Sequence, residues 1–293
     1  MIVKSIDELI GNTPVIYHKG IYIKLEYFNA SGSVKDRAAK WMIEGMEKDG
    51  RLKKGDTIVE PTSGNTGISL AMIGASKGYK VVLVMPDTMS KERRDMMRAY
   101  GAELVLTDGA LGMSGAVEEA KRLVKEKGYV MPQQFENEYN VLAHEESTAK
   151  EIIKDFKELD YFVAGIGTGG TITGVSKVIK SYYENVKIIG VEPEESPIIT
   201  KGYKGPHKIQ GIGAGFIPKI LDLKWVDEVV RVSYTDAKAT AQKIAKEGIF
   251  LGISSGAAIK VAYDLLEKYP DKKILVIAPD GGLKYLSTET YNS

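Results

Sequence analysis

The sequence predicts an α/β fold, in which mostly parallel sheets are flanked by helices. Short apolar strand patterns alternate with helical patterns along most of the chain, and glycine-rich turns separate them. The chain has 293 residues, of which 43% are hydrophobic, so it can bury a substantial core in one large or two modest domains. No repeat or low-complexity linker interrupts the alternation.

The expected elements of the first half are short apolar strands and helices with an apolar face. They are a strand at 21–25, a helix that begins near Arg37, a strand at 57–60, a helical run at 68–73 that ends near Gly78, a strand at 80–84 stopped by Pro86, and a helix closed by Gly128. The polar residues at 133–134 and 136–138 indicate a domain boundary near residues 135–142.

The second half continues the same alternation. A strand at 161–164 precedes a glycine loop and a helix, and a further strand follows at 187–191. The next helix has Thr235 as its candidate N-cap and Gly248 as its candidate C-cap. The last clear strand lies at 273–277.

Composition excludes several classes of protein. The net charge is +1, so no overall field attracts nucleic acid or a membrane surface. There is no cysteine for a disulfide or a thiolate, and the three histidines are scattered, so we expect no metal site. The first residues lack the pattern of a signal peptide, and the apolar runs are too short to span a bilayer. We therefore expect a cytoplasmic protein.

Lys35 stands in a small, turn-prone stretch, Gly32–Arg37, between an apolar strand and a helix. A lysine amine that is desolvated in a pocket becomes nucleophilic enough for Schiff-base chemistry. For this stretch alone a solvated lysine is the better interpretation, because nearly all of the 40 Lys and Arg side chains are expected in water.

A glycine loop at 165–170 matches the dinucleotide fingerprint, since it follows a strand, precedes a helix and has Glu192 at the end of the next strand. Main-chain amides at a helix N-terminus bind a single phosphate equally well. Taken alone, the spacing leaves both interpretations open.

Two further hydroxyl-rich turns are ordinary when taken singly. Thr62-Ser63-Gly64-Asn65-Thr66 precedes a helix and has the composition of an N-cap turn, and Ser254 opens a helix in the same way. Either turn could instead present polar groups to a ligand, because helix N-termini carry a partial positive charge.

Five motifs in order make the sequence resemble the cysteine synthase (O-acetylserine sulfhydrylase) family, which shares its pyridoxal-phosphate fold with tryptophan synthase β. They are the stretch at Lys35, residues 62–67, 167–171, 210–218 and 252–257. The resemblance runs from about Ile6 to about Ser287. It implies fold type II with two domains, residues 36–142 and residues 1–35 with 143–293, and pyridoxal 5′-phosphate between them.

The resemblance also implies site residues. Lys35 would hold the cofactor and act as general base. The cofactor would further be bound by Asn65, Gly167, Thr168, Gly169, Gly170, Thr171 and Ser254. The substrate would be bound by Thr62, Ser63, Gly64, Thr66, Gln134 and Gly213.

The implied reaction is replacement of the acetoxy group of O-acetyl-L-serine by sulfide, which gives L-cysteine and acetate. Alternatives with the same cofactor are an O-phosphoserine sulfhydrylase, a cysteine desulfhydrase and a cystathionine β-synthase-like enzyme. The phosphate ester is disfavoured because residues 211–218 contain no Arg or Lys to face it. A dinucleotide-binding protein is the remote alternative.

The resemblance implies a homodimer, and it suggests a serine acetyltransferase whose C-terminal carboxylate would bind the loop at 62–66. Departures from the family pattern at Ala30, Glu138 and Val141 affect loops and partner surfaces rather than the chemistry. We expect no nucleic-acid or membrane partner.

Overall fold

The computed structural model describes residues 2–292 and divides into two compact units. Unit 1 combines the described residues up to Ile10 with Lys35–Asn140, and unit 2 combines Gly11–Val34 with the described residues from Val141 onward. Residues 2–10 thus group with the smaller unit. The reason is local: the main-chain oxygen of Asp7 accepts a hydrogen bond from Lys40 Nζ at 3.0 Å.

Unit 1 contains a three-stranded parallel sheet in the order β3, β4, β5. These strands are β3 (Thr57–Pro61), β4 (Lys80–Pro86) and β5 (Glu103–Thr107), and the helices are α1 (Lys35–Lys48), α2 (Asn65–Lys77), α3 (Lys91–Ala99) and α4 (Gly112–Lys127). Helix α4 packs against the sheet, where Ala116 and Ala120 meet Val82 and Val84. Because α4 covers this face of the sheet, the strand side chains on it are apolar.

Unit 2 contains a six-stranded sheet in the order β1-β2-β9-β6-β7-β8, in which only the β1–β2 pair is antiparallel. The strands are β1 (Val15–His18), β2 (Ile21–Leu25), β6 (Tyr161–Gly165), β7 (Lys187–Pro193), β8 (Glu228–Val232) and β9 (Ile274–Ala278). The helices are α6 (Ala149–Asp155), α7 (Gly170–Tyr182), α8 (Ile198–Lys201), α9 (Tyr234–Lys246) and α10 (Ile253–Lys268), preceded by a π-helical turn η4 (His144–Thr148). The short helix α5 (Glu138–Ala143) contains the boundary between the two units.

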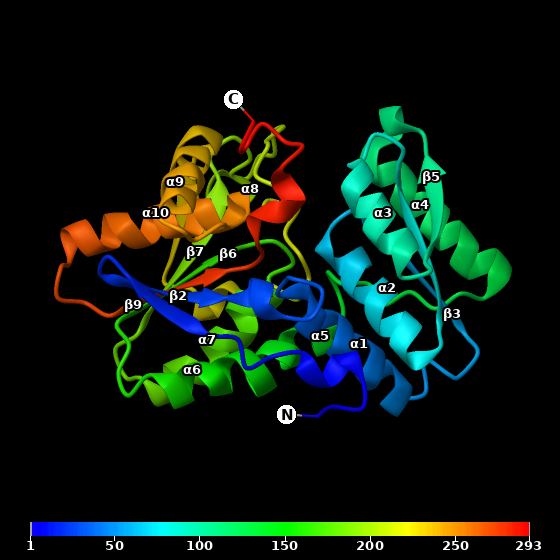
Figure 1. Cartoon of the computed structure of the whole chain (residues 1–293), viewed down its shortest axis with the longest axis horizontal. Helices are drawn as coiled ribbons and strands as arrows, with labels where there is room; N and C mark the ends of the chain where they lie inside the picture. Colours follow the sequence, from blue (N-terminus) through cyan, green and yellow to red (C-terminus); the bar gives the residue numbers. More distant parts are fainter. Residues whose placement is uncertain (1, 293) are drawn as a thin grey trace. The chain divides into compact units, whose positions relative to one another are not determined.

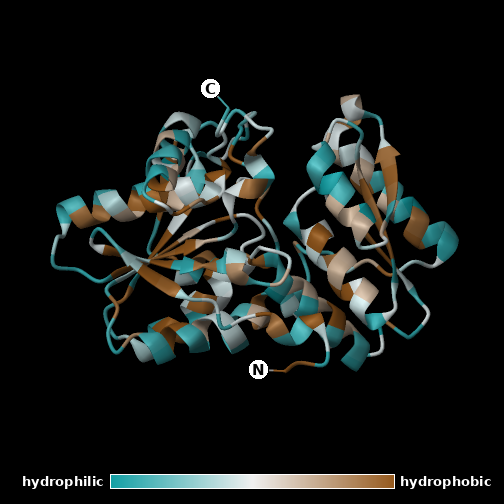
Figure 2. Cartoon of the chain, in the orientation of Figure 1, coloured by the Kyte–Doolittle hydropathy of each residue, from teal (hydrophilic) through white to brown (hydrophobic). Residues whose placement is uncertain are grey.

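Alternate residues of the central strands of unit 2 enter two separate cores. Val163 and Val276 pack with α9 and α10, whereas Phe162 and Leu275 pack with α6 and α7. In Figure 1 the sheet accordingly lies between the α9–α10 pair and the α6–α7 pair. The strands are apolar along most of their length, as Figure 2 shows, because helices cover both faces.

Most expected elements are confirmed, with shifts at their ends. Helix α1 begins at Lys35 rather than at Arg37, and Gly78 and Gly128 end α2 and α4 in the left-handed conformation that glycine adopts freely. Thr235 as an N-cap is wrong, because the hydroxyl of Ser233 accepts the Asp236 amide and starts α9 earlier.

The C-cap of α9 is Glu247 rather than Gly248, which follows it with a φ of +91°. The remaining short turns are the 3-10 helices η1 (Ile6–Leu9), η2 (Glu26–Phe28), η3 (Gly109–Leu111), η5 (Leu223–Trp225) and η6 (Gly282–Tyr285). Within residues 2–292, no helix has both the length and the apolar character that crossing a bilayer requires.

Candidate active site

Lys35 is the first residue of α1, and the chain that leads into it is firmly held. The Val34 amide donates to the Pro279 carbonyl at 2.8 Å, and Ser33 pairs with Asp280 in an antiparallel bridge. The main chain just before Lys35 is thus bound to the segment that follows β9. Lys35 itself is partly buried.

The loop Thr62–Thr66 joins β3 to α2 in unit 1. The Thr62 amide donates to the Val84 carbonyl at 3.0 Å, which fixes the start of the loop to β4. The N-cap of α2 is Gly64, which has no side chain to accept hydrogen bonds from the first turn. Helix N-termini present main-chain N–H groups and partial positive charge, so this loop can bind a carboxylate.

Thr66 and Gln134 meet in unit 1, although they are far apart in the sequence. The Thr66 hydroxyl donates to Gln134 Oε1 at 2.6 Å, and both side chains are buried. Asn140 Nδ2 donates to the Gln134 main-chain oxygen at 2.8 Å. The structure therefore brings two of the expected substrate residues into direct contact.

Gln134 is also held from β3, by a residue that the motifs did not single out. The Glu60 carboxylate accepts hydrogen bonds from the main-chain amides of Gln133, at 2.9 Å, and Gln134, at 3.0 Å. Burial raises the pKa of Glu60 to about 7, against the opposing effect of these two amides.

The glycine loop of unit 2 forms a bare main-chain cradle at the N-terminus of α7. A Cβ added to Gly167 would lie 2.3 Å from the main-chain oxygen of Gly211, and one added to Gly169 would lie 2.7 Å from the Cβ of Leu221. Gly169 also has a φ of +87°, which disfavours any other residue. The Gly170 amide lies 3.3 Å from the Thr168 hydroxyl oxygen.

Ser254 lies beside this cradle in unit 2, in the first turn of α10. A Cβ added to Gly211, whose φ is +95°, would lie 3.6 Å from Ser254 Oγ. The Gly213 amide donates to the Ile166 carbonyl at 3.0 Å. The structure therefore gathers three expected motifs, the glycine loop, the loop at 210–218 and the start of α10, into one cluster.

Two histidines support that cluster, and no local motif points to either of them. His144 Nε2 lies 3.2 Å from Thr171 Oγ1, and His207 Nε2 lies 2.8 Å from the Gly213 carbonyl. The two residues of each pair are not adjacent in the sequence, so only the folded structure reveals the contact between them. Within the described part of the chain, no group of three or more His, Cys, Asp or Glu side chains is placed to bind a metal ion.

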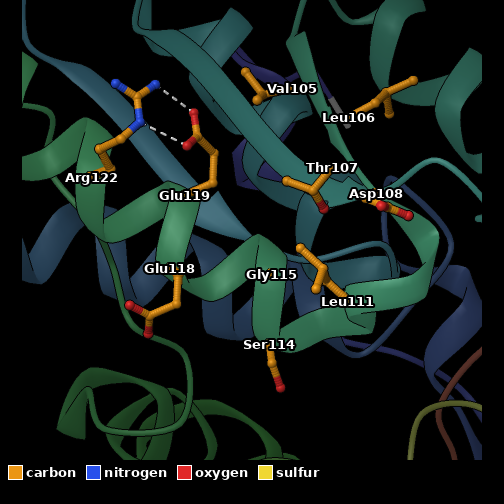
Figure 3. Close-up of a pocket in the computed structure, with 10 residues that line it drawn as sticks. All are labelled: Val105, Leu106, Thr107, Asp108, Leu111, Ser114, Gly115, Glu118, Glu119 and Arg122. Atoms are coloured by element: carbon orange, nitrogen blue, oxygen red, sulfur yellow. Dashed lines mark hydrogen bonds and ion pairs between the residues drawn. The ribbon is translucent and has the colours of Figure 1, made fainter.

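A separate hollow of about 670 Å³ lies along β5 and α4 (Figure 3). Leu106 and Leu111 line it, and the Glu119–Arg122 ion pair of 2.7 Å closes one side. None of the expected site residues lines this hollow, so it is not part of the candidate active site.

Comparisons with known proteins find relatives that match almost the whole chain. The family model described as pyridoxal-phosphate dependent enzyme matches residues 6–280. The cysteine synthase of Staphylococcus aureus is 49% identical over 302 residues, which cover 99% of this chain and 97% of that protein.

Two solved structures are similar over almost the whole chain. The cysteine synthase of Entamoeba histolytica has a TM-score of 0.97 and 46% identity, and the match covers 100% of this chain and 92% of that one. A hydrogen sulfide-producing enzyme of Fusobacterium nucleatum has a TM-score of 0.93 and 47% identity, and the match covers 97% of this chain and 100% of that one.

Proposed function

This chain belongs to the pyridoxal-phosphate dependent enzyme family, and we propose that it replaces the acetoxy group of O-acetyl-L-serine with sulfide, giving L-cysteine and acetate. The observation that carries the proposal is the 49% identity to a cysteine synthase over 99% of this chain. Pyridoxal phosphate is the cofactor of the family.

The residues of unit 2 fit the polar ends of this cofactor. The positions of Gly167 and Gly169 at the start of α7 exclude side chains, because an added Cβ would collide with Gly211 or Leu221. The main-chain amides at this helix N-terminus suit a phosphate group. Ser254, with 3% of its surface exposed, offers a neutral hydroxyl for the ring nitrogen. In the proposed site, the cofactor is held by Lys35 covalently, and by Asn65, Gly167, Thr168, Gly169, Gly170, Thr171 and Ser254.

The bound cofactor supplies an electron sink that weakens the bonds at the α-carbon of an amino acid. In the proposed mechanism the substrate amine would displace the Lys35 amine from the cofactor, and the freed amine would take the α-proton as general base. The position of Lys35 at the start of α1 limits the directions from which it acts. The N-terminus of α2 binds the substrate carboxylate through Thr62, Ser63, Gly64 and Thr66, together with Gln134. Gly213 lies along the side of the leaving group.

The leaving group is proposed to be acetate rather than phosphate. Residues 211–218 contain no Arg or Lys, so nothing there offsets the desolvation of a dianion. Release of hydrogen sulfide from L-cysteine is a second candidate activity, because the chain is 47% identical to the hydrogen sulfide-producing enzyme of F. nucleatum.

The proposed substrates are small molecules, and we further propose a homodimer in the cytoplasm. A serine acetyltransferase is a proposed partner, because a C-terminal carboxylate has the same chemistry as the substrate carboxylate. A peptide that ends in isoleucine should then compete with O-acetylserine, and no competition at high peptide concentration would contradict this partner.

The main test compares substrates of the purified holoenzyme. O-acetylserine, O-phosphoserine and L-cysteine are each assayed with and without sulfide, and kcat/KM is expected to be highest for O-acetylserine with sulfide. An equal or higher value for O-phosphoserine would overturn the proposed leaving group.

A further inference from the structure

Glu60 is a buried carboxylate in the sheet of unit 1. It lies on β3 with 1% of its surface exposed, among the apolar residues Ile58 and Val59. No described lysine, arginine or histidine forms an ion pair with it. Burial of a carboxylate without a cation is costly unless its oxygens accept hydrogen bonds.

Both oxygens of Glu60 accept hydrogen bonds from one short turn. Oε2 accepts the Gln133 amide at 2.9 Å, and Oε1 accepts the Gln134 amide at 3.0 Å. Gln133 has a φ of +59°, which is uncommon for a residue other than glycine and persists only where surrounding contacts enforce it. The two bonds to Glu60 are contacts of that kind.

The turn held by Glu60 presents Gln134 to Thr66. The Thr66 hydroxyl donates to Gln134 Oε1 at 2.6 Å, and Thr66 belongs to the first turn of α2. Glu60 also stands just two residues before Thr62, where the loop begins. One carboxylate therefore connects the strand that leads into the loop with the turn that carries Gln134.

We propose that Glu60 is a positioning residue for the amino-acid carboxylate, which acts by holding the main chain of Gln133 and Gln134 so that Gln134 meets Thr66. This inference rests on the proposed function for the identity of the substrate. A carboxylate suits the task because it offers one acceptor oxygen to each of two amides, whereas a glutamine side chain offers only one acceptor oxygen.

The test is a double-mutant cycle in the holoenzyme, with Glu60→Gln and Gln134→Ala singly and together. Glu60→Gln should raise KM for O-acetylserine about tenfold and leave kcat within about twofold. In the Gln134→Ala background, Glu60→Gln should raise KM for O-acetylserine by less than about twofold, because the side chain through which Glu60 acts is already absent.

A second readout is independent of the reaction. Hydrogen exchange of a peptide spanning residues 131–137, measured without substrate, should be faster in Glu60→Gln than in the parent. Tyr79→Phe is the control, because it removes a partly buried hydrogen bond of 2.8 Å to Glu47 elsewhere in unit 1. It should leave both KM and the exchange of that peptide unchanged.

Glu60→Asp, which keeps the charge but cannot reach both amides, replaces Glu60→Gln in the cycle if the latter does not fold. An unchanged KM, an equal effect in both backgrounds, or unchanged exchange at 131–137 would overturn the proposal. If the parent does not convert O-acetylserine, the proposed function fails, and the exchange measurement still decides whether Glu60 holds the turn.

Discussion

The N-termini of α2 and α7 can each bind an anion, but the loops that lead into them are packed differently. Each follows a parallel strand and a glycine-containing loop, and each offers main-chain amides to an anion. At α7 the loop is packed so closely that a Cβ on Gly167 would lie 2.3 Å from a main-chain oxygen. At α2 a Cβ on Gly64 would meet nothing within 4 Å.

The difference matches the two ligands proposed for these helices. A cofactor phosphate stays in place, and a rigid main-chain cradle suits it because nothing has to move. A substrate carboxylate enters and leaves in each cycle, and the Thr66 and Gln134 side chains can form and break hydrogen bonds while Glu60 keeps the main chain of the turn in place. The comparison predicts that changes in the two loops will have different consequences.

The largest effect is expected from Lys35→Ala, which leaves both helix N-termini intact. The variant should retain bound cofactor but lose turnover by about 10²–10⁴-fold, because no other residue is proposed as general base. Borohydride treatment followed by peptide mapping should find no modified lysine. A reducible lysine adduct together with normal turnover would show that Lys35 has neither role.

The pair Gly167→Ala and Gly64→Ala tests the comparison directly. The first change forces a methyl group against the Gly211 carbonyl, and overpacking of this kind costs about 1–3 kcal/mol. The affinity of the protein for the cofactor should therefore fall by roughly ten- to hundredfold. The second change meets open space and should leave cofactor content unchanged. Cofactor content is measured by visible absorbance per protein, and equal losses in the two variants would contradict the distinction between the loops.

Thr66→Ala should affect the substrate without affecting the cofactor. The lost hydroxyl removes the 2.6 Å bond to Gln134 and a proposed contact to a charged group, which costs about 1.5–3 kcal/mol, or roughly ten- to hundredfold in kcat/KM. The absorbance of the resting enzyme should stay nearly the same. If O-acetylserine is used as well by the variant as by the parent, Thr66 does not belong to the substrate site.

The change with the smallest expected effect on the reaction itself concerns Glu60, whose burial makes the stability of the fold depend on pH. Its pKa is about 7 in the folded chain and near 4.5 when unfolded, so the folded state holds the proton more tightly. The contribution of Glu60 to the free energy of unfolding is therefore fully present below pH 4.5. It falls by on the order of 3 kcal/mol as the pH rises through 7. Glu60→Gln should remove this decline in stability, which is measured as the thermal midpoint of each protein from pH 5 to 8. Parallel curves for the parent and the variant would contradict the prediction.

Local patterns determined much of the fold. The strand at 21–25 and the strand stopped by Pro86 lie where their apolar runs predict them, because the pattern of a buried strand is contained in a few adjacent residues. The local pattern does not determine the residues at which helices begin and end. Ser233 starts α9 ahead of Thr235, since two neighbouring hydroxyl residues compete to cap and their sequence does not reveal which amide each can reach.

The sequence by itself determined the α/β class, the glycine and hydroxyl motifs, and the family that they resemble. The tertiary structure decided which distant segments meet: β9 lies between β2 and β6, and Glu60 binds the amides of Gln133 and Gln134. It also decided that Gly211 lies close to both Gly167 and Ser254. The physical reason is that propensity and periodicity act over neighbouring residues, whereas strand order and buried hydrogen bonds depend on how the whole chain packs.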